Sequence, residues 1–146
     1  MLNFETHNTL ETEKLGEQLA KSLTGNEIIA FFGTMGMGKT AFIRGLCNGL
    51  ECLDDVSSPT FAIVHEYKGK YPVFHFDMYR IKDYDDLYST GFFEYLNNGI
   101  LLIEWSENID NIIPDDAIKI TIKKGSQDED RIINIEGIDK IWKYLP

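Results

Sequence analysis

The chain has 146 residues, which suits one domain and allows a core without disulfides or a structural metal. Its net charge of −10 disfavours autonomous binding to nucleic acid, although a nucleotide can bind at a locally positive loop. With no apolar segment of transmembrane length and no visible signal peptide, we expect a cytoplasmic protein without membrane contacts, whose Cys47 and Cys52 are reduced thiols.

An amphipathic helix is the first predicted element, from Asn8 to Leu23. Asn8 and Glu11 have the spacing of a capping box, and leucines at helical intervals form the apolar stripe. Gly25 is suited to the C′ position after the end of a helix. We expect this helix to cover one face of a sheet.

A buried strand over Ile28–Phe32 precedes Gly33–Thr40, which matches the phosphate-binding pattern G-x-x-x-x-G-K-[ST]. Glycines let successive backbone N–H groups surround an anion, and Lys39 adds a positive charge near the β- and γ-phosphates. The Thr40 hydroxyl is placed to ligate Mg²⁺. Since a predicted helix over residues 40–50 follows, the motif lies between strand and helix, and it predicts a nucleotide phosphate site.

Beyond that helix, an acidic connector leads into Ser57–Phe61, where Pro59 favours an extended loop. Residues 62–67 and 73–76 are predicted strands, and the turn at 68–70 makes them a hairpin. This hairpin ends on polar residues that could belong to a site.

The second half of the chain continues the alternation of helices and strands. Two short helices are predicted over residues 83–98, and the apolar run Ile100–Ile103 predicts a strand that is buried on both faces. Residues 118–123 and 131–135 are further strands, and residues 138–145 suggest a closing helix. The sequence therefore predicts a single three-layer α/β domain over residues 1–146, with a mixed sheet flanked by helices, the P-loop strand at its centre and the hairpin at one side.

Acidic side chains directly follow two of the predicted strands. Glu104 has the place of a Walker B acid, or it is a solvated residue at a strand end. Asp77 could orient the attacking water or hold the metal, or it is an ordinary turn aspartate. Arg80 could contact phosphate or a partner, or lie at the rim, and His75 is either a satisfied strand histidine or a proton carrier.

Several signatures of other nucleotide-binding classes do not occur. The sequence has no N-K-x-D, and no glycine has an aspartate three residues before it, which argues against a GTPase. Its only arginines are Arg44, Arg80 and Arg131, too few for the arginine-rich lid of a small-molecule kinase. An ATP-binding domain with a switch-like loop at Ser57–Phe61 remains. A small-molecule or protein kinase, or a nucleotide-gated binding module with negligible turnover, are the alternatives.

Four motifs in order resemble the TsaE family of small bacterial ATPases, which act in tRNA threonylcarbamoyladenosine biosynthesis. They are Gly33–Thr40, Ser58–Phe61, His75–Arg80 and Ile103–Trp105, and Thr12–Gly16 also looks like the family's T-x-x-L-G. The likeness covers nearly the whole chain.

The resemblance implies a role for each matching residue. Lys39, Asp77 and Glu104 would be catalytic, and Thr40 and Glu104 would hold Mg²⁺. Ser58 and Thr60 would belong to the switch loop that senses the γ-phosphate, and Arg80 would contact a partner or phosphate. The implied nucleotide contacts are Thr12, Gly33, Met35, Gly36, Met37, Gly38, Lys39, Thr40, Ala41, Trp105 and Arg131.

The resemblance also implies ATP and Mg²⁺ as cofactors and a TsaB–TsaD complex as partner, with tRNA reached only through that complex. Hydrolysis would be weak in the isolated chain and stimulated by the partners. The chain departs from the family where Thr34 and Met37 replace the usual Asp and Ala, and where Ala41 replaces a common Thr. The residues that contact phosphate are intact, so the departures concern the rate of turnover rather than binding.

Overall fold

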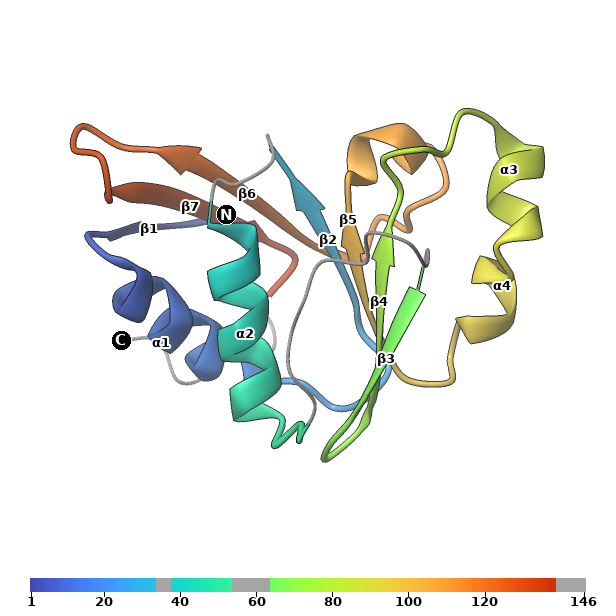
Figure 1. The fold of residues 1–146 in the computed structure, drawn as a ribbon, viewed down its shortest axis with the longest axis horizontal. Helices are drawn as coiled ribbons and strands as arrows, with labels where there is room; N and C mark the ends of the chain where they lie inside the picture. Colours follow the sequence, from blue (N-terminus) through green and yellow to red (C-terminus); the bar gives the residue numbers. More distant parts are fainter. Residues whose placement is uncertain (34–37, 54–63, 139–146) are drawn as a thin grey trace.

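The computed structural model describes residues 1–33, 38–53 and 64–138 (Figure 1). The helices and strands alternate along the chain as an α/β protein requires. Their order is β1 (Leu2–Thr6), α1 (Thr9–Ala20), β2 (Ile28–Phe32), α2 (Lys39–Gly49), β3 (Val64–Lys68), β4 (Pro72–Asp77), α3 (Tyr84–Ser89), α4 (Phe92–Tyr95), β5 (Ile100–Glu104), the 3₁₀ helix η1 (Ser106–Ile109), β6 (Ile118–Lys124) and β7 (Arg131–Glu136).

Within the described residues, seven strands form one mixed sheet in the order β1-β7-β6-β2-β5-β4-β3. The strand before the P-loop, β2, lies at the centre and pairs in parallel with β5 and β6. Strand β4 is parallel to β5, while β3, β7 and β1 add antiparallel pairs toward the two edges. The predicted mixed sheet, its central strand and the hairpin at one side are therefore confirmed.

Both faces of the sheet are covered, which makes the three predicted layers. Ile29 and Phe31 of β2 pack with α1 and α2, whereas Ala30, which points the other way, packs with residues of α3, α4 and η1. Every residue of β5 is buried, as expected for a parallel strand between two layers. In Figure 1, α1 and α2 lie together, and α3 and α4 lie across β4 and β5 from them.

Helices α1 and α2 meet at unusually close range because glycines line their contact. A Cβ atom built on Gly45 would lie 2.0 Å from the carbonyl oxygen of Glu13. A Cβ atom on Gly16 would lie 2.4 Å from the carbonyl oxygen of Phe42. An ion pair of 2.6 Å between Arg44 and Glu13 also joins the two helices. This contact positions the N-terminus of α2, which is also where the P-loop ends.

Some boundaries differ from the sequence-based expectations. Helix α1 starts after Asn8 as predicted, but it ends at Ala20 with Lys21 as its C-cap, because the following turn tightens to i→i+3 hydrogen bonds. Gly25 is therefore not the C′ residue. Its φ of 120° serves the turn into β2 instead. Strand β1 and helix η1 were not predicted, although residues 2–6 do alternate apolar and polar side chains.

Two of the predicted segments cannot be compared with the structure. The loop Ser57–Phe61 lies outside the described residues, and so does the closing helix beyond Ile138. Across the ranges that the structure describes, none of the helices has the length and apolar character needed to cross a membrane.

Candidate functional site

Of the predicted site residues, Lys39, Asp77 and Glu104 lie at one edge of the sheet. At this edge the parallel strands β2, β4 and β5 end and α2 begins (Figure 1). Open α/β sheets bind ligands at this edge because the carboxyl ends of the strands and the helix N-terminus meet there. Asp77 and Glu104 are register partners at the ends of β4 and β5. Val73, four residues before Asp77, and Leu102, two residues before Glu104, pack in the same cluster as α2, so alternation turns both carboxylates toward the P-loop helix.

The described parts of the P-loop have the backbone conformation that its glycines allow. Gly33 has a φ of 120° and Gly38, the N-cap of α2, has a φ of 91°. The N–H of Gly33 donates to Glu107 Oε2 at 3.1 Å, and a Cβ on Gly33 would lie 2.9 Å from the carbonyl oxygen of Ile122. Both glycines are therefore required by the local geometry. The intervening residues, including Met35, Gly36 and Met37, lie outside the described residues.

Lys39 is almost fully buried at the start of α2, with 2% of its surface exposed. Its Nζ donates to the carbonyl oxygen of Gly33 at 3.2 Å and lies 5.0 Å from the centre of the Trp105 ring. The ammonium group is thus held against the loop by a carbonyl and an aromatic face. Thr40, the next residue, is exposed, so its hydroxyl is accessible in the first turn of α2.

Trp105 connects β5 to η1 in a conformation that is uncommon for residues other than glycine. Its φ is 58°, in the left-handed region, directly after Glu104. The ring packs against Tyr79 at a centroid distance of 4.9 Å, in addition to its contact with Lys39. Backbone strain of this kind is concentrated at functional sites, where surrounding contacts hold it.

A buried chain of hydrogen bonds fixes the Glu104 carboxylate. His75 Nε2 lies 2.7 Å from Glu104 Oε2, and His75 Nδ1 lies 3.0 Å from the hydroxyl of Tyr67. An ionised carboxylate only accepts, so Nε2 of a neutral imidazole carries the proton and Nδ1 accepts from Tyr67. Of the two interpretations of His75, the structure supports the satisfied strand histidine. The sequence did not predict the hydrogen bond of Tyr67 to His75, because this contact depends on the pairing of β3 with β4.

Asp77 is half-buried beside Glu104 and also forms a turn. Its Oδ1 accepts from the N–H of Tyr79 at 2.9 Å, the geometry of an Asx turn. Burial is the main cause that raises the pKa of Asp77, and the charge of Glu104 raises it further. The Tyr79 hydrogen bond is the largest of the causes that oppose this rise in pKa. The turn interpretation of Asp77 is therefore confirmed. Its role in the chemistry stays a prediction, for which a perturbed pKa is the expected sign.

A small pocket of about 210 Å³ opens beside Gly38, on the α1 side of the P-loop helix. Arg131 lines it and donates from Nη1 to the carbonyl oxygens of Asp128 and Asp130, each at 2.8 Å. Its buried Nε has no hydrogen-bond partner among the described residues. The volume is below the 300–1,000 Å³ typical of whole-ligand pockets, so it suits part of a ligand. The lining residues are Asn8, Thr9, Thr12, Gly38, Ala41, Glu129 and Arg131.

The pocket thus brings together four predicted nucleotide contacts, Thr12, Gly38, Ala41 and Arg131. Thr12 is buried, and its hydroxyl is hydrogen-bonded to that of Thr6 at 2.7 Å. Three of the lining residues were not predicted, because nothing in their local sequence marks them. Arg80 is exposed in the segment after β4, and Ser58 and Thr60 lie outside the described residues.

Comparisons with known proteins all point to the same family. The family model described as "Threonylcarbamoyl adenosine biosynthesis protein TsaE" matches residues 6–133. A curated protein of Bacillus subtilis, named tRNA threonylcarbamoyladenosine biosynthesis protein TsaE, is 34% identical over 146 residues, covering 99% of this chain and 90% of its own. A Rickettsia felis protein of the same name is 37% identical over 120 residues, covering 80% of this chain and 70% of its own. The crystal structure of Bacillus subtilis YdiB is similar with a TM-score of 0.70 and 28% identity, over 92% of this chain and 83% of that one.

Proposed function

The chain belongs to the TsaE family, and we propose that it acts in tRNA threonylcarbamoyladenosine biosynthesis as an ATP-binding protein that hydrolyses ATP with Mg²⁺. The observation that carries the proposal is the meeting of three charged groups at one edge of the sheet. Buried Lys39 begins the helix after the P-loop, and the carboxylates of Asp77 and Glu104 lie on the same face of neighbouring strands. This is the set of charges that phosphoryl transfer to water requires.

The oxygen donors at this edge suit Mg²⁺. A hydroxyl on Thr40 and carboxylates on Glu104 and Asp77 are hard oxygen ligands, and Mg²⁺ is usually held by one or two carboxylates together with phosphate and water. We assign Thr40 and Glu104 as the residues that would hold it. When bound, Mg²⁺ would neutralise charge on the phosphate oxygens during transfer.

The residues of the chain then have separate tasks. Lys39 exchanges its contact with the Gly33 carbonyl for phosphate oxygens, which compensate better for a buried ammonium charge. His75 keeps Glu104 in one rotamer through the 2.7 Å hydrogen bond. Asp77, with its raised pKa, is better suited than an ordinary aspartate to accept a proton from an attacking water near neutral pH.

The partner in this proposal is a TsaB–TsaD complex, as the family resemblance implies. The net charge of −10 opposes direct binding of tRNA, which fits an accessory protein that reaches tRNA through other proteins in the cytoplasm. ATP hydrolysis would support repeated cycles of modification, and the transfer of the threonylcarbamoyl group would belong to the partners.

Steady-state phosphate release from Mg²⁺–ATP tests the site. Lys39→Ala and Thr40→Ala should each abolish measurable turnover, because they remove the phosphate-binding charge and a metal ligand. Lys14→Ala removes a lysine from the exposed surface of α1 and is the matched control, expected to keep the parent rate. If either site variant hydrolysed ATP as the parent does, the assignment of the site would be wrong.

Adding purified TsaB and TsaD tests the partner. The rate of phosphate release should rise, and the three proteins should elute together when ATP is present. An unchanged rate without co-elution would refute the partnership. Transfer of the γ-phosphate to an acceptor other than water would instead indicate a kinase, and ATP-dependent co-elution without turnover would indicate a nucleotide-gated binding module.

A further inference from the structure

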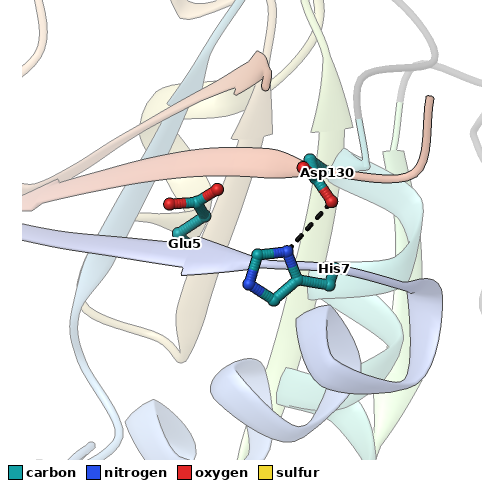
Figure 2. A group of neighbouring side chains, drawn as sticks. All are labelled: Glu5, His7 and Asp130. Atoms are coloured by element: carbon teal, nitrogen blue, oxygen red, sulfur yellow. Dashed lines mark hydrogen bonds and ion pairs between the residues drawn. The ribbon is translucent and has the colours of Figure 1, made fainter. Parts of the chain in front are cut away.

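A second group of potential metal ligands consists of Glu5, His7 and Asp130 (Figure 2). It lies on the opposite half of the sheet from the proposed catalytic residues. Glu5 lies on β1, His7 follows that strand, and Asp130 precedes β7. Because β1 and β7 are antiparallel with Thr6 opposite Arg131, the next pair outward is His7 with Asp130. Glu5 and His7 are two residues apart, so they point to the same side of β1. Strand pairing therefore gathers an imidazole and two carboxylates from both ends of the described chain.

We propose that Glu5, His7 and Asp130 form a binding site for a divalent transition-metal ion of the Zn²⁺ class. One donor atom from each residue lies within 4.8 Å of the other two. His7 Nδ1 is 3.0 Å from Asp130 Oδ1, and a tetrahedral ion with bonds of about 2.0–2.1 Å separates neighbouring ligands by only slightly more. Glu5 is exposed, so its side chain can move the remaining distance without disturbing the core.

The ligand set decides which class of ion fits. An imidazole nitrogen with carboxylate oxygens suits Zn²⁺ and its transition-metal neighbours, whereas Mg²⁺ and Ca²⁺ prefer oxygen ligands throughout. Three protein ligands leave a fourth tetrahedral position for water. The carboxylates of Glu5 and Asp130, with Glu11 bonded to the N–H of His7, place negative charge here that favours a cation.

Asp130 already has the supporting contacts of a metal-binding carboxylate. Its side chain is 8% exposed, and its Oδ2 accepts from the hydroxyl of Ser126 at 3.3 Å and from the N–H of Gln127 at 3.2 Å. These bonds fix the rotamer and leave Oδ1 directed at His7. In metal sites, groups that hydrogen-bond to a ligand side chain in this way orient that ligand toward the ion. An ion in place of the proton between His7 and Asp130 would therefore meet a preorganised carboxylate.

The position of the site suggests what the ion does. Asn8 follows His7, and Glu129 and Arg131 flank Asp130, and all three residues line the 210 Å³ pocket. An ion that joins His7 to Asp130 would tie the two walls of that pocket together and fix the turn whose carbonyls hold Arg131. Bound Zn²⁺ should therefore change nucleotide affinity. This consequence rests on the proposed ATP site, whereas metal binding itself does not.

Calorimetric titration of the full chain with Zn²⁺, without nucleotide, tests the site. We expect one ion per chain, and the visible absorption of bound Co²⁺ should report a tetrahedral environment. His7→Gln and Glu5→Gln, both surface substitutions, should each weaken Zn²⁺ binding at least tenfold. His65→Gln and Asp128→Asn are the matched controls, a histidine on β3 and an exposed carboxylate in the nearby turn, and both should bind as the parent does.

Three results would overturn the proposal: no saturable binding, equal affinity in the His7→Gln variant, or a loss in Glu5→Gln no larger than in Asp128→Asn. Excess Mg²⁺ should leave Zn²⁺ bound, and displacement by Mg²⁺ would also count against the proposed class of ion. Because none of these measurements contains ATP, they distinguish a failure of the metal site from a failure of the proposed ATPase.

Discussion

The buried hydrogen-bond chain behind Glu104 makes a quantitative prediction about stability. His75→Phe keeps an aromatic ring of similar size but removes the 2.7 Å bond to Glu104 and the 3.0 Å bond to Tyr67. Glu104 is 6% exposed, so its carboxylate loses a charged hydrogen bond where little water can replace it. We expect the free energy of unfolding to fall by about 3 kcal/mol.

The second half of the prediction concerns the reverse deletion. Glu104→Leu removes the carboxylate and leaves the N–H of His75 without its acceptor, at a cost of about 2 kcal/mol. The double variant removes both the Glu104 carboxylate and the His75 N–H, so neither is left buried without its partner. Only the Tyr67 hydroxyl then loses its bond to His75. The double variant should therefore cost about 2 kcal/mol, well below the sum of about 5 kcal/mol for the single changes.

Urea unfolding of the parent, both single variants and the double variant measures this coupling. His65→Phe is the matched histidine control on the neighbouring strand β3, where the side chain is only half-buried, and it should change the unfolding free energy by less than about 1 kcal/mol. If the two single costs added to within about 0.5 kcal/mol, the residues would be uncoupled and the reasoning would be refuted. Under the proposed function, His75→Phe should also raise the Mg²⁺ concentration needed for ATP hydrolysis.

Three further changes test the scaffold, each by chemical unfolding. Gly45→Ala should destabilise the protein by about 1–2 kcal/mol, because a Cβ 2.0 Å from the Glu13 carbonyl forces α1 and α2 apart by more than the gain in helix propensity; a neutral result would contradict this packing. Asn8→Ala should cost about 1 kcal/mol by removing the cap that accepts from the N–H of Glu11, and an unchanged midpoint would show that the cap contributes nothing. Burial acts to raise the pKa of Glu27, but hydrogen bonds from residues 24 and 25 lower it overall. Ionised Glu27 therefore stabilises the fold at pH values above the pKa that it has in the unfolded chain, and Glu27→Gln should lower the free energy of unfolding by about 1 kcal/mol at pH 7. The gap in stability between parent and variant should shrink as pH falls below 4.5. A gap that does not change with pH would contradict the stabilising role of the ionised carboxylate.

Most helices and strands could be predicted because their apolar periodicity, caps and turn residues lie within the segment itself. The apolar run 100–103 predicted a strand buried on both faces, and the structure buries all of β5. The Asn8 cap predicted where α1 begins, and the pattern at Gly33–Thr40 was predicted to lie between a strand and a helix, which are β2 and α2. The end of α1 was predicted too late, because an i→i+3 turn after Ala20 has no clear sequence signal.

The candidate site was predictable to a different degree for each residue. Lys39 and Thr40 were identified by a motif whose spacing is itself the requirement of phosphate binding. Asp77 and Glu104 were found because each follows an apolar strand, but nothing local says that the two strands are neighbours. Asn8 had only the signal of a helix cap and Glu129 had none, because the pocket that they line forms where β1 pairs with β7.

The sequence by itself determined the class of this protein: an α/β domain that carries a phosphate-binding sequence pattern, with acidic residues at the ends of two strands. Tertiary structure decided which of these groups meet. Tyr67 reaches His75 and His75 reaches Glu104 only because β3, β4 and β5 pair in one register, and His7 meets Asp130 across 123 residues of sequence. The physical reason is that hydrophobic periodicity is a property of a single segment, whereas strand order and register depend on how all segments bury their apolar faces together.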